Sequence, residues 1–204
     1  MLPTRLATAR TLLRPWHVDD RPALLRHADD PAVARTLRLV PSPYDDAAAS
    51  AWLAYAAASP PPEGVWAIEV GGEAVGCVGL ERGPDIGRHA LEVGYWLGRA
   101  VWGRGLATEV VRAVTGAAWA EPDVARVHAS VFGHNVASMR VLEKAGYRRE
   151  AVLARAGVKD GRAFDRVVYA RTRDTGLPYA PAEAPAGGGR RRAMPNAPSP
   201  NAGA

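Results

Sequence analysis

Two glycines separated by one arginine, Gly103, Arg104 and Gly105, stand between an apolar segment and a helical pattern. Residues 91–97 are rich in aromatic and β-branched side chains, which predicts a buried strand. Residues 106–120 place apolar side chains at three- and four-residue spacing, which predicts an amphipathic helix. Uncovered backbone N–H groups at a helix start, together with the helix dipole and an arginine, bind phosphate groups. The turn therefore predicts a phosphate or pyrophosphate site, with glycines that serve only turn geometry as the alternative.

A second segment, residues 134–147, predicts a short helix with polar side chains near its start. Asn135 is suited to the N-cap, because its side-chain oxygen can accept a hydrogen bond from a free backbone N–H. Gly146 stands just beyond the C-terminal end, where helices often finish with a glycine.

Together the two segments resemble the GNAT superfamily of N-acetyltransferases, and within it the RimJ/RimL-like branch, whose members acetylate ribosomal-protein N-termini. The phosphate-binding signature of the superfamily, Arg/Gln-x-x-Gly-x-Gly/Ala, corresponds to Trp102, Gly105 and Ala107, with the tryptophan that the branch commonly carries. The second signature of the branch matches Asn135, Ser138, Arg140, Glu143, Lys144, Gly146 and Tyr147. Weaker similarities extend the resemblance over residues 5–175.

The resemblance implies an α+β fold in the broad α/β class: a mostly antiparallel mixed sheet of about seven strands, flanked by about four helices and splayed at the cofactor site. It implies acetyl-CoA as co-substrate, with its pyrophosphate on the glycine turn and its pantetheine arm lying like a strand beside Tyr95, Trp96 and Leu97, where it pairs with their backbone groups. The cofactor-binding residues implied in this way are Tyr95, Trp96, Leu97, Trp102, Gly103, Arg104, Gly105, Leu106, Ala107, Thr108, Asn135, Ser138 and Arg140.

Ser138 and Glu92 are the candidates for proton transfer. In the wider family a tyrosine seven residues after the asparagine often protonates the leaving thiolate, but Leu142 stands at that position here. The branch carries a serine three residues after the asparagine, so we expect Ser138 to protonate the sulfur, directly or through water. Glu92 stands where several relatives place a catalytic carboxylate, and we expect it to receive the amine proton or to orient the amine. The alternatives are a serine that only caps a turn and a carboxylate that faces solvent.

The composition predicts one enzyme-sized domain followed by a tail. The chain has 204 residues, of which 48% are apolar, enough for one substantial core. Residues 181–204 consist mainly of Pro, Ala, Gly and Asn with a run of three arginines, so we expect a domain over residues 1–180 and a disordered tail. The net charge is +5, and the body lacks a dense basic stripe, so we do not expect a nucleic-acid partner.

Metal, disulfide and membrane functions find little support in the sequence. The one cysteine, Cys77, excludes an intrachain disulfide and argues against a cysteine-based metal site, and we expect no metal. The chain shows no signal peptide, and its most apolar stretch, residues 47–58, is too short to span a bilayer. We therefore expect a cytoplasmic protein.

The remaining strands expected from the pattern cover residues 11–14, 65–70, 74–80, 124–132, 148–152 and 165–169. A first helix is expected to begin at Asp19–Asp20, and a second helix is expected to span residues 45–58. Residues 65–80 should form a hairpin about two glycines at positions 71 and 72.

The acceptor is the least specified part of the sequence. The resemblance places its site in residues 29–44, 59–63 and 154–164, and the candidates for lining it are Arg35, Arg38, Tyr44 and Trp52. The branch implies a primary amine, a protein or peptide N-terminus, as the acceptor. A small amine or aminoglycoside-like compound is an alternative, as is a non-catalytic acyl-CoA-binding module with a regulatory role or an RNA-associated protein that uses the arginine tail. Relatives often dimerise, so a homodimer is also open.

Overall fold

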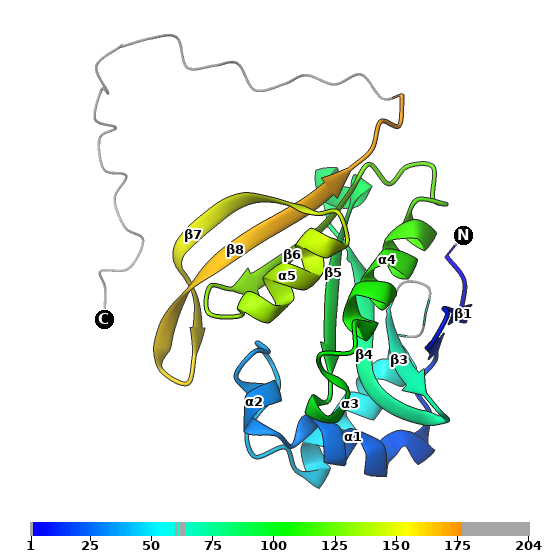
Figure 1. Ribbon diagram of the computed structural model, residues 1–204, viewed down its shortest axis with the longest axis vertical. Coiled ribbons are helices and arrows are strands. Elements are labelled where there is room, and N and C mark those ends of the chain that lie inside the picture. Colours follow the sequence, from blue (N-terminus) through cyan, green and yellow to red (C-terminus); the bar gives the residue numbers. More distant parts are fainter. Residues whose placement is uncertain (1, 60, 62–63, 177–204) are drawn as a thin grey trace, which may run out of the picture.

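The computed structural model describes residues 2–59, 61 and 64–176 (Figure 1). These residues form one mixed sheet of eight strands in the order β1-β2-β3-β4-β5-β6-β8-β7, with helices on both of its faces. This confirms the predicted α+β fold. The tail expected over residues 181–204 lies outside the described residues, so the boundary at residue 180 stays a prediction.

The strands are β1 Leu6–Ala7, β2 Leu12–Arg14, β3 Val65–Val70, β4 Glu73–Arg82, β5 Ala90–Leu97, β6 Arg126–Phe132, β7 Arg148–Lys159 and β8 Arg162–Thr172. The helices are α1 Arg21–Ala28, α2 Pro31–Ala34, α3 Asp46–Ala58, α4 Leu106–Ala118 and α5 Val136–Lys144, with short 3-10 turns at Val18–Asp20, Asp85–His89 and Arg99–Val101. The unexpected elements are β1 and α2, which have two and four residues. Elements this short contain hardly more than one period, too little for a repeating hydrophobic pattern to be recognised in the sequence.

The two last strands are longer than predicted because their connection is a tight turn. Asp160 and Gly161 both have positive φ, 50° and 72°, which suits a two-residue hairpin turn that matches the twist of the strands. Pairing of β7 with β8 therefore continues up to Lys159 and Arg162, far beyond residues 152 and 165.

The sheet has two covered sides. On one side Leu91 and Val93 of β5 pack with α4 and α5 in the main core, and we call this the α4 side. Trp96 of β5 points the other way and packs with α1 and α3, and we call this the α1 side. Side chains alternate along a strand, so Glu92 also points to the α1 side.

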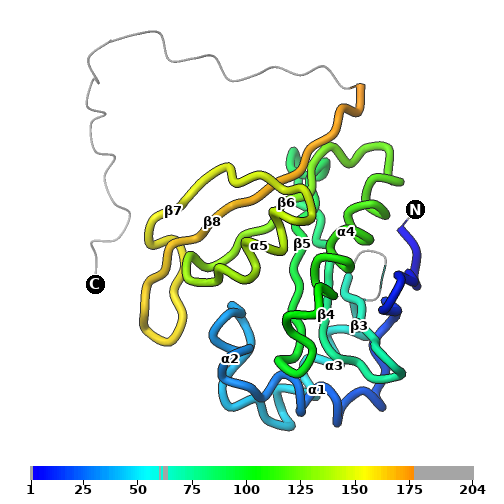
Figure 2. The backbone as a smooth tube through the Cα atoms, viewed as in Figure 1, coloured from blue at the N-terminus to red at the C-terminus, as the bar shows by residue number. Residues whose placement is uncertain are grey.

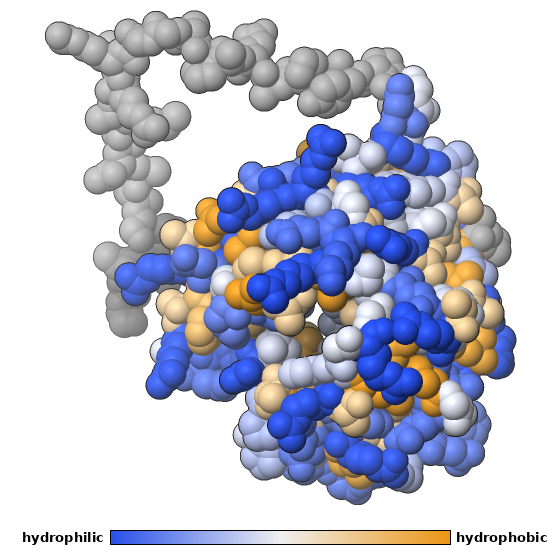
Figure 3. Space-filling view, viewed as in Figure 1, coloured by the Kyte–Doolittle hydropathy of each residue, from blue (hydrophilic) through white to orange (hydrophobic). Residues whose placement is uncertain are grey.

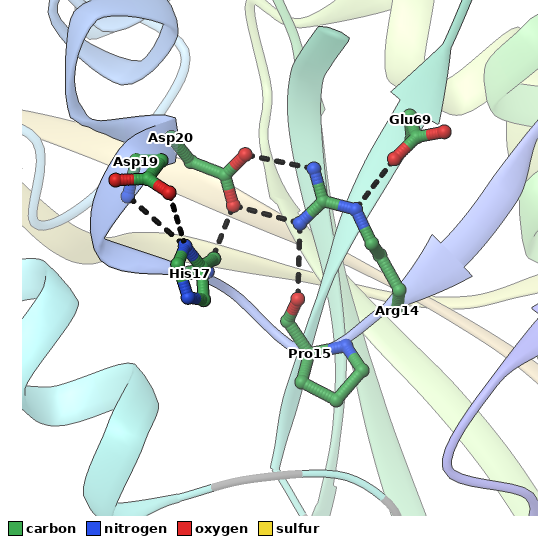
Figure 4. Close-up of polar contacts among 6 residues, drawn as sticks. All are labelled: Arg14, Pro15, His17, Asp19, Asp20 and Glu69. Atoms are coloured by element: carbon green, nitrogen blue, oxygen red, sulfur yellow. Dashed lines mark hydrogen bonds and ion pairs between the residues drawn. The ribbon is translucent and has the colours of Figure 1, made fainter. Parts of the chain in front are cut away.

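A buried ion cluster fixes the start of the α1 segment to the sheet (Figure 4). The guanidinium of Arg14 donates to both carboxylate oxygens of Asp20 at 2.7 Å and to Glu69 at 2.5 Å. Burial alone raises the pKa of the Asp20 carboxyl, but the hydrogen bonds from Arg14 and from the backbone N–H of His17 outweigh it and hold the pKa below its usual range. The cluster therefore joins β2, β3 and the turn before α1.

Replacing Asp20 by Asn is expected to lower the free energy of unfolding at pH 7 by about 1–3 kcal/mol, because it removes one of the two carboxylates that pair with the half-buried Arg14 and leaves only Glu69. The folded-state pKa of Asp20 is depressed, so its contribution is complete above the unfolded value of about 3.9 and is lost as the pH falls through the folded value. Urea unfolding at pH 7 and at acid pH measures both effects. Asp19→Asn is the matched control, because the Asp19 side chain is 86% exposed, and an equal loss in both variants would contradict the prediction.

Candidate active site

The sheet opens between its two central strands. β5 and β6 run parallel and pair only over Ala90–Glu92 with Arg126–His128. Beyond these residues β5 stays paired with β4, β6 stays paired with β8, and the two strands diverge (Figure 2). The predicted splay is therefore present. From the α4 side, the surface is hollowed between the part formed by α5 and the part formed by α1 and α2 (Figure 3).

Part of the β5 backbone faces this gap. The C=O of His89 accepts from Ala125 on the β6 side, whereas the C=O of Ala90 accepts from Gly83 on the β4 side. Backbone groups of successive strand residues point in alternate directions, so those of Val93 and Tyr95 face the gap where the β6 ladder has ended. A ligand with amide groups can add here as a strand would.

The neighbouring residues that we expected to pair with pantetheine are placed differently. By the same alternation the backbone groups of Trp96 point to β4. The C=O of Leu97 accepts a hydrogen bond of 2.6 Å from the indole Nε1 of Trp102. Among Tyr95, Trp96 and Leu97, it is thus Tyr95 whose N–H and C=O both face the gap without such a contact.

The glycine turn lies at the start of α4, as predicted. Gly103 and Gly105 have φ of 73° and 78°, a left-handed conformation that glycine adopts without strain. The four residues from Trp102 to Gly105 are exposed, while the side chain of Leu106 is buried in the core. The turn therefore presents its backbone to solvent at the positive end of the α4 dipole. The predicted neighbours Ala107 and Thr108 lie in the first turn of α4 and are half-buried.

A second arginine stands at this turn, and the sequence analysis did not find it. The guanidinium of Arg10 donates to the C=O of Arg104 at 2.7 Å, and a Cβ on Gly105 would lie 3.6 Å from its NH2 group. The carboxylate of Glu109 accepts hydrogen bonds from the backbone N–H of Arg10 at 2.8 Å and from the Arg10 guanidinium at 2.7 Å. Because 99 residues separate Arg10 from Glu109, no local pattern predicts the contact.

Glu109 links the chain segment before β2 to α4. Its carboxylate accepts from the hydroxyl of Thr8 at 2.5 Å as well as from Arg10. The hydrogen bond from Thr8 and the contacts with Arg10 lower the pKa of Glu109 despite partial burial. Arg104 is thus part of the glycine turn, and the guanidinium of Arg10 lies beside the turn, paired with Glu109.

Two hydroxyl groups meet on the α4 side of the gap. The Ser138 Oγ lies 2.7 Å from the Tyr95 hydroxyl, which is also within 3.2 Å of the Ser138 C=O. Burial strongly raises the pKa of Tyr95, so its hydroxyl stays protonated. Leu142, which occupies the position of the family's usual tyrosine, is completely buried in the main core. The sequence placed only the backbone of Tyr95 at the cofactor and missed its side chain.

Asn135 caps α5, as predicted. Its Oδ1 accepts from the backbone N–H of Ser138 at 3.1 Å, which fixes the first turn of the helix beside the gap. Arg140 lies on α5 two residues after Ser138 and is exposed. Its predicted contact with the cofactor stays a prediction.

Glu92 lies on the α1 side, at the last paired level of β5 and β6. Its partner across the ladder is His128, and both side chains are half-buried. Burial lowers the pKa of His128, although the charge of Glu92 opposes this shift, so the imidazole is neutral at pH 7. Ser138 and Glu92 therefore reach the gap from opposite sides of the sheet.

The four acceptor candidates fall into two groups. Tyr44 and Trp52 pack in the core between α1, α3 and the sheet. Arg35 and Arg38 are exposed in the segment after α2. A hydrogen bond connects this segment to the loop before α5, because the C=O of Arg35 accepts from the His134 ring at 3.1 Å. Lys159 likewise donates to the C=O of Val40 at 2.8 Å. These contacts place residues 35–40 against the loop before α5 and the β7–β8 hairpin.

In the described part of the chain, three or more His, Cys, Asp or Glu side chains nowhere group in a way that could hold a metal ion. No helix among the described residues combines the length and the apolar character needed to cross a membrane.

The chain is similar in sequence to known proteins. Residues 10–148 match the family described as "Acetyltransferase (GNAT) domain". The Bacillus subtilis protein named "Probable N-acetyltransferase YjcK" is 46% identical over 78 residues, which are 37% of this chain and 42% of YjcK. The chain spans about half the length of this and a second B. subtilis relative, 42% and 51%.

Solved structures agree over most of the chain. A structure from T. thermophilus that is assigned to the acetyltransferases is 31% identical, with a TM-score of 0.73 over 84% of this chain and 90% of that one. Mycobacterium smegmatis RimJ, solved with CoA-disulfide, has a TM-score of 0.71 over 87% and 91% of the two chains at 22% identity, so it shows the shared fold. Because the family match covers more than half of the sequence, from the segment before β2 to the start of β7, the chain belongs to the GNAT family of acetyltransferases.

Proposed function

We propose that the protein is an N-acetyltransferase that moves the acetyl group of acetyl-CoA directly to a primary amine, with a protein or peptide N-terminus as the acceptor. The observation that carries the proposal is the gap between β5 and β6, which has a glycine turn at one end and the side chains of Ser138 and Glu92 on opposite sides of the sheet. The family of the chain supports the same chemistry.

Acetyl-CoA fits the groups that the gap offers. The backbone N–H groups at the glycine turn, with Arg104 and Arg10, suit the pyrophosphate. The backbone of Val93 and Tyr95 suits the amides of the pantetheine arm. The cap of α5 uses only the Oδ1 of Asn135, so its side-chain NH2 can still donate to pantetheine.

The reaction then needs no covalent enzyme intermediate. The amine nitrogen attacks the thioester carbonyl from the α1 side, and a backbone N–H of Val93 or Tyr95 stabilises the negative charge on the carbonyl oxygen. Glu92 receives the proton that the attacking nitrogen loses, directly or through water. The C–S bond breaks, and Ser138 protonates the thiolate on the α4 side while Tyr95 hydrogen-bonds to Ser138.

Replacing Glu92 by Gln is expected to lower kcat by about 100-fold with little change in acetyl-CoA affinity, because only the proton acceptor is lost. Steady-state kinetics with acetyl-CoA and the best acceptor measure the effect. Glu81→Gln is the matched control: Glu81 is the direct cross-strand neighbour of Glu92, has the same charge and is exposed. Equal losses in the two variants would assign the effect to local charge instead of proton transfer.

The proposed function is tested by measuring thiol release from acetyl-CoA with three classes of acceptor: short peptides with different N-termini, polyamines and aminoglycosides. We expect turnover with peptides, and mass spectrometry should place the acetyl group on the α-amine. Turnover with a small amine alone would contradict the acceptor class. Tight acetyl-CoA binding without turnover on any acceptor would favour a regulatory acyl-CoA-binding module, and no acetyl-CoA binding would overturn the proposal.

A further inference from the structure

A half-buried arginine, Arg166 on β8, lies beside the gap with an uncharged partner. Its Nε donates to the hydroxyl of Ser130 on β6 at 2.8 Å. Within residues 2–59, 61 and 64–176, no carboxylate forms an ion pair with it. A partly desolvated guanidinium that is held by a neutral hydroxyl keeps most of its donors for a ligand, and two parallel donors suit a carboxylate.

The guanidinium lies on the same side of the sheet as Glu92. Glu92 and His128 are the last paired residues of β5 and β6, and Ser130 lies two residues beyond His128. Two residues along a strand return to the same face, so Ser130 also points to the α1 side, roughly 7 Å further along the gap. Arg166 is the cross-strand partner of Phe132, and its side chain reaches back along β6 to Ser130.

On the α1 side of the sheet, beside Glu92 and near Arg166, β5 has no side chain at Gly94. Gly94 is exposed, its φ is not in the left-handed region, and a Cβ there would meet nothing within 4 Å. By contrast, a Cβ on Gly76 of β4 would lie 2.2 Å from the C=O of Trp96. Neither packing nor backbone conformation therefore requires glycine at position 94, although glycine weakens a strand. Its missing side chain leaves space on the α1 side, just beyond Glu92, for a ligand.

Three aromatic rings form a cluster next to Arg166, whose cross-strand partner is Phe132. Phe132 stacks on His134 with centroids 5.5 Å apart, and Phe164 lies 5.4 Å from Phe132 and 4.9 Å from His134. These rings come from β6, the loop before α5 and β8. A Cβ at Gly157 would lie 3.2 Å from the Phe132 ring and 3.5 Å from Arg166 Cγ, so the apolar part of the Arg166 side chain lies near Phe132. An ionic contact is stronger at a half-buried group such as Arg166 than in bulk water.

We propose that Arg166 binds a carboxylate of the acceptor, a few bonds from the amine whose proton passes to Glu92. This inference rests on the proposed function and narrows its acceptor to amines that carry an acidic group near the reacting nitrogen. Ser130 orients the guanidinium, and Gly94 leaves the path between amine and carboxylate open. An acidic side chain near a peptide N-terminus and a small amino acid share this chemistry.

The experiment compares acceptors that differ only in one charge. One pair is a peptide with Asp or Asn as its second residue, and the other is β-alanine and its primary amide. We expect wild-type kcat/KM to favour the acid over its neutral partner by roughly tenfold or more in one pair. Arg166→Gln should bring that ratio close to one and leave the neutral acceptor nearly unaffected. The pair that responds identifies the source of the carboxylate.

Two further variants separate recognition from folding. Arg162→Gln removes the same charge from the exposed end of β8 and should keep the preference. Ser130→Ala keeps the charge of Arg166 but removes its hydroxyl partner, and should weaken the preference only in part. The acetyl-CoA affinity of each variant reports that the cofactor side is intact.

Calorimetric titration of both acceptor pairs into the CoA-loaded protein measures the same discrimination without turnover. Equal treatment of acid and neutral acceptors by the wild type, or an equal loss for both in Arg166→Gln, would overturn the role of Arg166. Acetylation of any amine would still support the proposed function in that case. Discrimination in the titration with no acetylation of any acceptor would support the role of Arg166 and contradict the acetyltransferase.

Discussion

Gly105→Glu is expected to raise the Kd for acetyl-CoA by about 100-fold or more, the largest effect on cofactor binding that the site predicts. Gly105 has a φ of 78°, which a residue with a side chain adopts only at a cost of about 1–3 kcal/mol. The new carboxylate would also stand next to the Arg10 guanidinium and repel the pyrophosphate. Calorimetry with acetyl-CoA measures the change.

Gly116→Glu is the matched control for this substitution. Gly116 lies in the same helix α4, is exposed, and a Cβ there would meet nothing within 4 Å. We expect this variant to bind acetyl-CoA with almost unchanged affinity. If Gly105→Glu also bound it normally, the glycine turn would not be the phosphate site.

Ser138→Ala is expected to lower kcat by about 100-fold while acetyl-CoA affinity stays close to that of the wild type. The alanine cannot protonate the thiolate, but α5 keeps its cap because the Asn135 side chain binds the backbone N–H of residue 138. Tyr95→Phe removes the hydroxyl that lies 2.7 Å from Ser138 Oγ, and should lower kcat by a smaller factor. Steady-state kinetics at saturating acetyl-CoA measure both.

The double variant tests whether the two hydroxyls act together. If Tyr95 acts through Ser138, adding Tyr95→Phe to Ser138→Ala should cause little further loss. Ser50→Ala, which removes an exposed hydroxyl from α3, is the control and should leave kcat unchanged. Fully multiplicative losses would show that Tyr95 acts independently, and an unchanged kcat in Ser138→Ala would exclude Ser138 as the donor.

What the sequence predicted well rests on local signals. The helix after Asn135 has a capping residue, an apolar period and a terminal glycine within fourteen residues, and the structure confirms its start and end. The glycine turn before α4 is equally local. The gap was predicted from the family resemblance alone. The residue pattern of either strand could not predict it, because the end of pairing between parallel strands does not change the alternation of side chains along them.

What the sequence missed depends on contacts between distant segments. Tyr95 meets Ser138 across 43 residues and Arg166 meets Ser130 across 36, and neither pair carries a spacing that marks it. Both tyrosine and arginine also fit ordinary packing roles in strands. The register of the sheet and the packing of α5 on it bring these groups to one opening.

The short ladder between β5 and β6 makes the sheet two half-sheets, β1 to β5 and β6 to β8, hinged at three residues. Packing of α4 on α5 and side-chain contacts such as Thr115 with Tyr147 join the halves on one face. A bound pantetheine arm would complete the missing hydrogen bonds between them. In the proposed binding mode acetyl-CoA takes the place of a strand, and we expect the free energy of unfolding of the protein to rise with the acetyl-CoA concentration.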